Sequence, residues 1–225
     1  MRGFKPEEAA VPVALFSVIG LASCTLDSIT LCKVVTYTGG AGSVLLVLAL
    51  LIYINPERWI TPGTALLGSA TLVAVVKVLV GAPRPPPESW LVGAEGPSFP
   101  SGHAAATAAF WTLAYLEYRR PALGIAGILH TLAVSTSRVA LGVHYSIDVA
   151  GGVVIGSLSA ALLREAARRW LWHVLGLSIA SSLALALASP GYRTPWLLAA
   201  VAALLWILVA IRGSDGRRRV SINSS

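Results

Sequence analysis

Long apolar runs alternate with short polar segments along the chain, and this pattern predicts helices that cross a membrane. A helix needs about 20 mainly apolar residues, with a range of roughly 17–25, to span the hydrocarbon core. Runs of this kind predict eight spans, at 9–26, 38–54, 61–80, 101–118, 121–137, 147–163, 171–189 and 194–212. Ahead of the second span, Asp27 to Tyr37 is expected to form a short interfacial segment, because the residues around its end are rich in glycine and small polar side chains.

The predicted fold class is therefore all-α, a polytopic bundle of transmembrane helices. Helices suit the bilayer because each one satisfies its own backbone hydrogen bonds. The composition agrees, since 56% of the residues are hydrophobic and 12% are charged, against about 25% charged in soluble domains. The mean hydropathy is +0.74. The net charge of +7 does not indicate a nucleic-acid partner, because the cations sit in short loops between apolar runs.

The distribution of Lys and Arg gives an expected orientation. With the N-terminus in the cytoplasm, 12 of the 17 fall on the inner side, namely Arg2, Lys5, Arg58, Arg119, Arg120, Arg164, Arg168, Arg169, Arg212, Arg217, Arg218 and Arg219. The outer side then holds Lys33, Lys77, Arg84, Arg138 and Arg193. The positive-inside rule therefore predicts a cell-membrane protein with a cytoplasmic N-terminus.

Three polar clusters interrupt the apolar pattern, all at ends of predicted spans. They are Lys77 with Arg84-Pro85, then Pro100-Ser101-Gly102-His103, then Ser137-Arg138 with His144 and Asp148. With alternating spans, the end of the third, the start of the fourth and the end of the fifth share one membrane face. The expected orientation makes that face extracytoplasmic.

The first two clusters contain groups that bind anions. Arg84 lies on a proline-stiffened loop and can grip phosphate oxygens bidentately, whereas Lys77 acts as a point charge. Lys77 alone could equally be a lysine that extends to the interface. Ser101 is a candidate N-cap, and a helix that begins at Gly102 and His103 would present free N–H groups to an anion. The alternative is a capped helix whose histidine faces water or headgroups.

The third cluster pairs a histidine with a carboxylate. If the chain is helical from Tyr145, the four-residue spacing puts His144 and Asp148 on one face. A carboxylate bonded to one ring nitrogen fixes the tautomer and leaves the other nitrogen free to attack. A polar loop with Asp148 at a helix start would explain the carboxylate but not the pairing.

The spacings K-x6-RP, PSGH and SR-x5-H-x3-D, in that order, resemble the signature of the type 2 phosphatidic acid phosphatase family, which contains integral-membrane lipid phosphatases and soluble haloperoxidases. The resemblance covers roughly residues 15–165. It implies that His144 is the nucleophile and carries a phosphohistidine, that Asp148 orients it and that His103 is the general acid. It also implies that the phosphoryl oxygens are held by Lys77, Arg84, Ser101, Gly102 and Arg138.

The resemblance also sets the expected domains and substrates. Residues 1–165 would form a six-span phosphatase core, 166–213 two additional helices and 214–225 a basic cytoplasmic tail. The expected partners are membrane lipids and a lipid phosphate substrate, such as a polyprenyl diphosphate, phosphatidic acid or phosphatidylglycerol phosphate. No cofactor is expected, and no carboxylate cluster suited to Mg²⁺ lies near the motifs, so hydrolysis is predicted to be metal-independent.

Several alternatives stay open from the sequence. A lipid transporter or scramblase on the same scaffold would not hydrolyse its lipid, and a haloperoxidase-like site would bind vanadate. The oligomeric state, the lipid tail and the role of the two additional helices are not predicted. Cys24 and Cys32 are as compatible with a disulfide as with two unpaired thiols. His130, in the middle of the fifth span, is expected to be structural.

Overall fold

The computed structural model describes residues 5–25 and 28–188. The eighth predicted span and the basic tail lie outside the described residues. The helices in the described part are α1 (Pro6–Thr25), α2 (Ile29–Thr38), α3 (Ala41–Ile54), α4 (Pro56–Val80), α5 (Gly102–Tyr118), α6 (Pro121–Ala140) and α7 (Ser146–Ala188), with a short 3-10 turn, η1 (Pro87–Ser89). The predicted all-α class is confirmed, since these residues contain no strand.

The helices have the length and composition of membrane spans. Helices α1, α4, α6 and α7 are each long and apolar enough to cross a bilayer, and α2 with α3 has this length and composition as a bent pair, in the manner of a broken span or a re-entrant loop. The residues at the two ends of α4 explain where this helix begins and ends. Asn55 accepts a hydrogen bond from the backbone N–H of Arg58 and Pro56 opens the first turn, while Gly81 ends the helix in a left-handed conformation.

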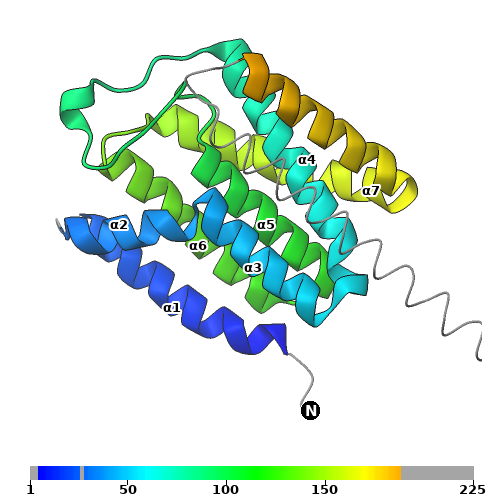
Figure 1. Ribbon diagram of the computed structural model, residues 1–225. Helices are drawn as coiled ribbons and strands as arrows, with labels where there is room; N and C mark the ends of the chain where they lie inside the picture. Colours follow the sequence, from blue (N-terminus) through cyan, green and yellow to red (C-terminus); the bar gives the residue numbers. More distant parts are fainter. Residues whose placement is uncertain (1–4, 26–27, 189–225) are drawn as a thin grey trace, which may run out of the picture.

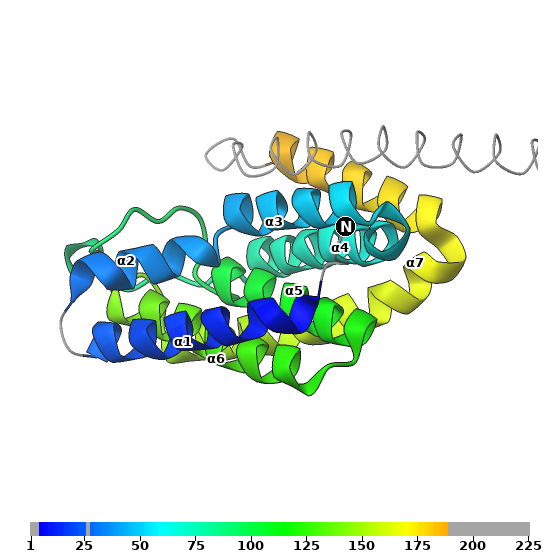
Figure 2. The same ribbon diagram turned by 90° about the horizontal axis from the view of Figure 1, so that it is seen from below.

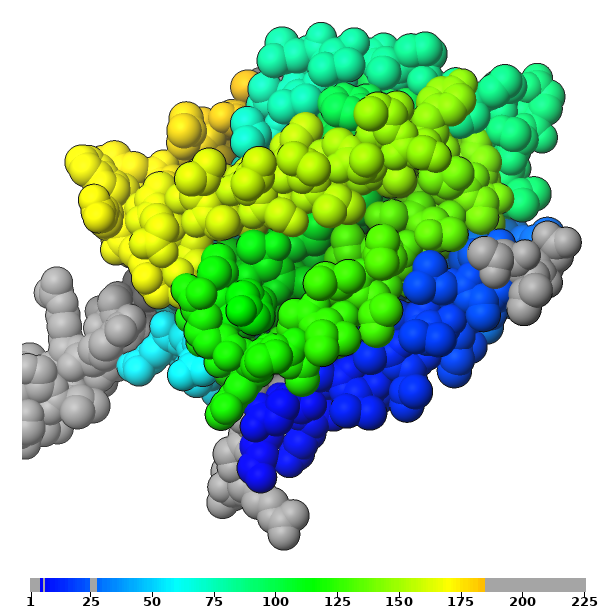
Figure 3. All heavy atoms as spheres, turned by 180° about the vertical axis from the view of Figure 1, so that it is seen from behind, coloured from blue at the N-terminus to red at the C-terminus, as the bar shows by residue number. Residues whose placement is uncertain are grey.

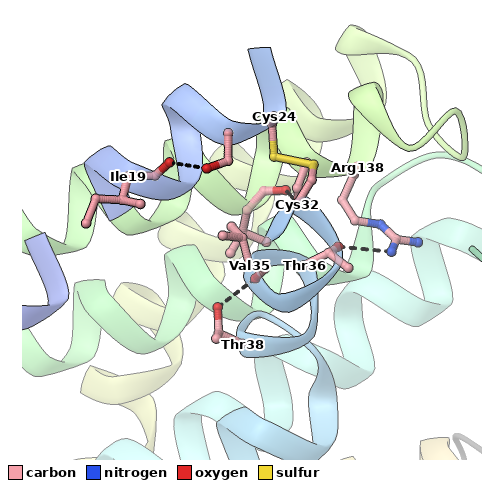
Figure 4. Close-up of a disulfide and its surroundings, with 10 residues drawn as sticks. Ile19, Cys24, Cys32, Val35, Thr36, Thr38 and Arg138 are labelled. Carbon is pink, nitrogen blue, oxygen red and sulfur yellow. Dashed lines mark hydrogen bonds between the residues drawn. A yellow bond between two sulfur atoms is a disulfide. The ribbon is translucent and has the colours of Figure 1, made fainter. Parts of the chain in front are cut away.

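The second span is bent where the glycines predict. Helices α2 and α3 meet at 48° across Gly39 and Gly40, so a separate short helix precedes α3, while its expected interfacial position stays a prediction. A side chain at Gly39 would collide with Val134 of α6, so this bend packs directly on the bundle. A disulfide between Cys24 and Cys32 ties α2 to the end of α1 (Figure 4).

The sixth and seventh predicted spans are both present within α7, which consists of two helices joined at a kink. Helix α7 continues through the residues expected to connect them and is broken only at Trp170, where φ is −135° and ψ is 43°. At that break the chain turns back, so that its later part runs beside α4 (Figure 2). Both halves bond to α4. Ser159 lies 2.6 Å from Ser69, and Ser182 lies 3.2 Å from Thr71, oxygen to oxygen.

Helix α5 is the centre of the bundle and packs against α4, α6 and α7 (Figure 1). Its face is lined by small residues, including Ala104, Ala105, Ala108 and Ala109, which are all buried. Small side chains let backbones approach closely in membrane bundles. From the opposite side, Figure 3 shows α1, α6 and the first half of α7 lying side by side.

His130 is held inside the bundle by two hydrogen bonds, in keeping with the structural role expected from the sequence. The indole N–H of Trp111 donates to its Nδ1 at 2.9 Å, and its Nε2 lies 2.8 Å from the hydroxyl oxygen of Thr38. Because an indole nitrogen only donates, Nδ1 accepts and the ring proton lies on Nε2. The ring therefore joins α5 and α6 to the end of α2, next to the bend.

The contact between α5 and α7 yields a stability prediction. A Cβ at Gly156 would lie 2.4 Å from the carbonyl oxygen of Ala105, whereas Gly176, later in the same helix, has nothing within 4 Å of the corresponding position. We expect Gly156→Ala to destabilise the protein by about 1–3 kcal/mol through overpacking. Gly176→Ala should be neutral or stabilising by up to about 1 kcal/mol. Thermal unfolding in detergent compares the two, and equal melting temperatures would contradict the close packing.

Candidate active site

The structure brings the three polar clusters together at one end of the bundle. The end of α4, the loop after it, the start of α5 and the connection from α6 to α7 meet there (Figure 1). Arg84, Arg138, Lys77 and His103 all lie near enough to His144 to act on its charge. Every site residue predicted from the sequence is therefore part of one constellation or adjacent to it.

The two cations of the first cluster hold the loop from Gly81 to Ser101. Lys77, in the last turn of α4, is buried and donates to the carbonyl oxygens of Pro97 at 2.7 Å and Ser98 at 3.2 Å. It is not a lysine that extends to the interface. The guanidinium of Arg84 donates to the carbonyl oxygens of Glu95 at 2.7 Å and Gly96 at 2.9 Å.

Arg84 also connects this loop to the third cluster. Its Nη1 donates to the carbonyl oxygen of Val143 at 2.8 Å and lies 3.2 Å from Nε2 of His144. A guanidinium has no acceptor, so Nε2 accepts this hydrogen bond and the ring proton lies on Nδ1. The lone pair of Nε2 therefore points toward Arg84.

The carboxylate of Asp148 completes the histidine pair, as the spacing predicts. Nδ1 of His144 lies 3.3 Å from Oδ2 of Asp148, and both side chains are buried. Oδ2 also accepts the backbone N–H of Tyr145 at 2.8 Å, which fixes the carboxylate at the start of α7. The main-chain oxygen of Asp148 accepts the N–H of Ser101 at 2.9 Å, so α7 and α5 begin side by side.

The electrostatics of this loop keep His144 neutral. Burial, followed by the positive charges of Arg84, Arg138 and Lys77, lowers the pKa of His144 well below its ordinary value. A neutral imidazole with its proton on Nδ1 has a lone pair on Nε2, which is the form that a nucleophilic histidine requires.

The start of α5 presents a hydroxyl and a histidine to the same region. Ser101 occupies the N-cap position, but its side chain makes no capping hydrogen bond. Its oxygen is buried and has no hydrogen-bond partner among the described residues, and a buried hydroxyl of this kind needs one. At Gly102, an added Cβ would meet nothing within 4 Å. His103 lies in the first turn of α5. Its Nε2 is close to Gly40, since a Cβ added at Gly40 would lie 3.5 Å from that nitrogen.

Two residues of the constellation were missed by sequence reasoning. The hydroxyl of Ser98 lies 2.5 Å from Oδ2 of Asp148 and 3.3 Å from Nδ1 of His144. Thr36, on α2, accepts a hydrogen bond from Nη1 of Arg138 at 3.1 Å (Figure 4). In the sequence, Ser98 could have been identified by its position three residues before Ser101 of the second cluster. Nothing in the sequence points to Thr36, because only the tertiary fold places α2 against Arg138.

Comparisons with known proteins agree with this geometry. The model of the PAP2 superfamily matches residues 58–172, just over half of the chain. The chain belongs to the PAP2 superfamily. The decaprenylphosphoryl-5-phosphoribose phosphatase of Mycobacterium tuberculosis, found in two strains, is 35% identical over 125 residues, which are 52% of this chain and 68% of that protein.

Two solved structures share the fold of this PAP2 protein. A transmembrane PAP2 type phosphatidylglycerolphosphate phosphatase from Bacillus subtilis has a TM-score of 0.52 and 22% identity, covering 72% of this chain and 88% of that one. LpxE from Aquifex aeolicus has a TM-score of 0.56 and 23% identity, covering 67% of this chain and 93% of that one.

These findings fix the class of protein. The family and the curated relatives make the chain a hydrolase of phosphoric esters, with a lipid phosphate as the substrate class. The apolar helices and the transmembrane neighbours make it an integral membrane protein. The resemblance inferred from the three motifs is thereby confirmed.

Contacts between the loop after α4 and the loop before α7 yield a prediction. Gly142 has a φ of +73°, and a Cβ there would collide with the carbonyl oxygen of Ser89. Gly142→Ala should therefore displace His144 from Arg84 and lower kcat by about tenfold or more, since left-handed strain alone is about 1–2 kcal/mol. Gly93→Ala, in the loop after α4 and with nothing within 4 Å of an added Cβ, is the control. Equal kcat values for the two variants would refute this role for the loop contact.

Proposed function

We propose that the protein removes a phosphate from an amphipathic lipid by way of a phosphohistidine on His144. The observation that carries this proposal is the pair of His144 and Asp148, with the Nε2 lone pair directed at the guanidinium of Arg84. The lone pair of Nε2 forms a bond to phosphorus as the bond from phosphorus to the lipid oxygen breaks, and His103 gives that oxygen a proton. Water then attacks phosphorus, passes a proton to His103 and returns the electron pair to Nε2.

The surrounding groups match the demands of this reaction. Phosphoryl transfer needs positioning and charge stabilisation more than covalent chemistry from the protein. Lys77, Arg84 and Arg138 supply positive charge, while Ser101 and the helix start at Gly102 supply donors for the equatorial oxygens. We propose that these groups take the place of a metal ion.

A cavity beside the site suits the apolar part of such a substrate. It has a volume of about 370 Å³ and lies between α1, α3 and α5, with the bend between α2 and α3 at one end. Thr107 lines it, and the hydroxyl of Thr107 donates to the carbonyl oxygen of His103 at 2.8 Å. Because His103 protonates the leaving oxygen, the lipid lies on the His103 side of phosphorus. We propose that the tail continues from there into this cavity.

The lipid is proposed to be polyprenyl-linked. The relative from Mycobacterium tuberculosis is named for a decaprenyl-linked phosphoribose, and that chemistry is transferred here as a hypothesis. The site is proposed to face the extracytoplasmic side, with residues 1–165 as the phosphatase core, following the charge distribution and the motif positions.

The central test is phosphate release by the purified protein in detergent with EDTA. The panel contains decaprenylphosphoryl-5-phosphoribose, a polyprenyl diphosphate, phosphatidic acid, phosphatidylglycerol phosphate and a water-soluble phosphate ester. We expect release from a polyprenyl-linked substrate that EDTA does not reduce, and a loss of about 10⁴-fold or more in His144→Ala, because the nucleophile is removed.

Two outcomes would overturn parts of this proposal. Hydrolysis by His144→Ala at the wild-type rate would remove the nucleophile assignment. Lipid movement across vesicles without any release of phosphate, in both proteins, would support a transporter or scramblase. Hydrolysis of an impermeant ester by sealed vesicles of known orientation reports which side the site faces.

The cavity has a matched test of its own. Val47 lines the cavity between α1, α3 and α5, and Leu132 lines a second cavity of about 600 Å³ between α5, α6 and α7. Both side chains are partly exposed on the bundle surface, at 43% and 51%. Val47→Trp should lower kcat/KM for a long-chain substrate by about 10-fold and leave a short-chain ester unaffected, because it fills tail space only. Leu132→Trp should leave kcat/KM unchanged for both substrates. If instead Leu132→Trp lowers kcat/KM for the long-chain substrate and Val47→Trp does not, the tail belongs in the second cavity.

A further inference from the structure

Ser98 lies at the centre of the contacts that hold the histidine pair. Its side chain is fully buried, and its hydroxyl is within hydrogen-bond distance of both members of the pair. The donor to Oδ2 of Asp148, at 2.5 Å, is the hydroxyl of Ser98. Because its proton is used there, the serine oxygen can only accept from His144.

The tautomer of His144 makes this arrangement consistent. Arg84 donates to Nε2, so the proton is on Nδ1 and points at two oxygens, those of Asp148 and Ser98, each at 3.3 Å. The N–H of His144 is thus shared by two acceptors that are themselves joined by a hydrogen bond. Rotation of the ring would break both contacts together.

The main chain of Ser98 is fixed independently of its side chain. Its N–H donates to the carbonyl oxygen of Ala82 at 2.8 Å, and its own carbonyl oxygen accepts from Lys77 at 3.2 Å. The serine is therefore held by the end of α4 and the loop after it, while its hydroxyl reaches the start of α7. Ser98 therefore connects Lys77, in the last turn of α4, directly to His144 and Asp148.

We infer that Ser98 is a positioning residue for the phosphatase reaction, holding His144 in the tautomer and orientation that direct Nε2 at phosphorus. This inference rests on the proposed function of His144. When Nε2 forms a bond to phosphorus, positive charge spreads to the Nδ1 side of the ring, where Asp148 and Ser98 both accept it. Ser98 acts through the pair and contacts no phosphoryl oxygen in this scheme.

The first test is Ser98→Ala, assayed with the preferred lipid of the wild-type enzyme. Loss of one hydrogen bond to a charged pair should lower kcat by about 10- to 100-fold, while KM changes by less than about threefold. The control is Ser159→Ala, which removes a buried serine bonded to Ser69 of α4 and should leave kcat unchanged. An unchanged kcat in Ser98→Ala, or a lower melting temperature with kcat and KM altered equally in both variants, would overturn the inference.

A second measurement tests whether Ser98 acts on the reaction through His144 and Asp148. If Ser98 acts with Asp148, then Ser98→Ala combined with Asp148→Asn should be no slower than Asp148→Asn alone, within about threefold, in a radiolabelled single-turnover assay. Fully additive losses would overturn the inference even if one variant folds poorly. Failure of the proposed function is distinguishable, because in that case the wild type releases no phosphate or His144→Ala keeps its activity.

Discussion

The site depends on keeping Lys77, Arg84 and Arg138 close together although their charges repel one another. Burial makes this repulsion stronger, because it removes the water that would screen it. The structure compensates with oxygen acceptors. Carbonyl oxygens of residues 95–98 surround Lys77 and Arg84, and the hydroxyl of Thr36 accepts from Arg138. The loop from 81 to 101 is thus part of the site and shaped by its cations.

This constraint explains why distant elements converge on one end of the bundle. The acceptor for Arg138 lies on α2, which the disulfide ties to α1 and which the ring of His130 ties to α5 and α6. The bend at Gly39 and Gly40 lets Thr36 of α2 reach Arg138 while α3 turns to pack against α4 and α5. The kind of interaction changes with depth, from hydrogen bonds around the cations to close packing of alanines and glycines along α5.

The sequence predicts the parts of the structure that local patterns determine. Apolar runs locate the helices, and motif spacing brings His144 and Asp148 together. It does not predict that the helix of the sixth span extends through Arg164 and Arg169 as far as the kink at Trp170, since a cluster of arginines between two apolar runs is typical of a cytoplasmic loop. Arginine is a good helix former, and the helix continues until the backbone breaks at Trp170.

Ser98 and Thr36 escape prediction for a different reason. Each is a small polar residue without a periodic pattern, and its partner lies 50 or 102 positions away in the chain. Only the folded backbone selects these two from the many serines and threonines of the sequence. Residues that bear charge can be identified from composition, whereas the residues that orient them are identified from geometry.

The contact between Arg84 and His144 places a condition on how the reaction begins. Nε2 of His144 accepts from Arg84, and in the proposed mechanism the same lone pair forms the bond to phosphorus. An arriving phosphate therefore has to draw the guanidinium onto its own oxygens, which releases Nε2 at the moment that phosphorus comes within reach. In that scheme, binding of the phosphate and activation of the nucleophile are one event, and a lipid whose phosphate cannot engage Arg84 leaves the histidine blocked.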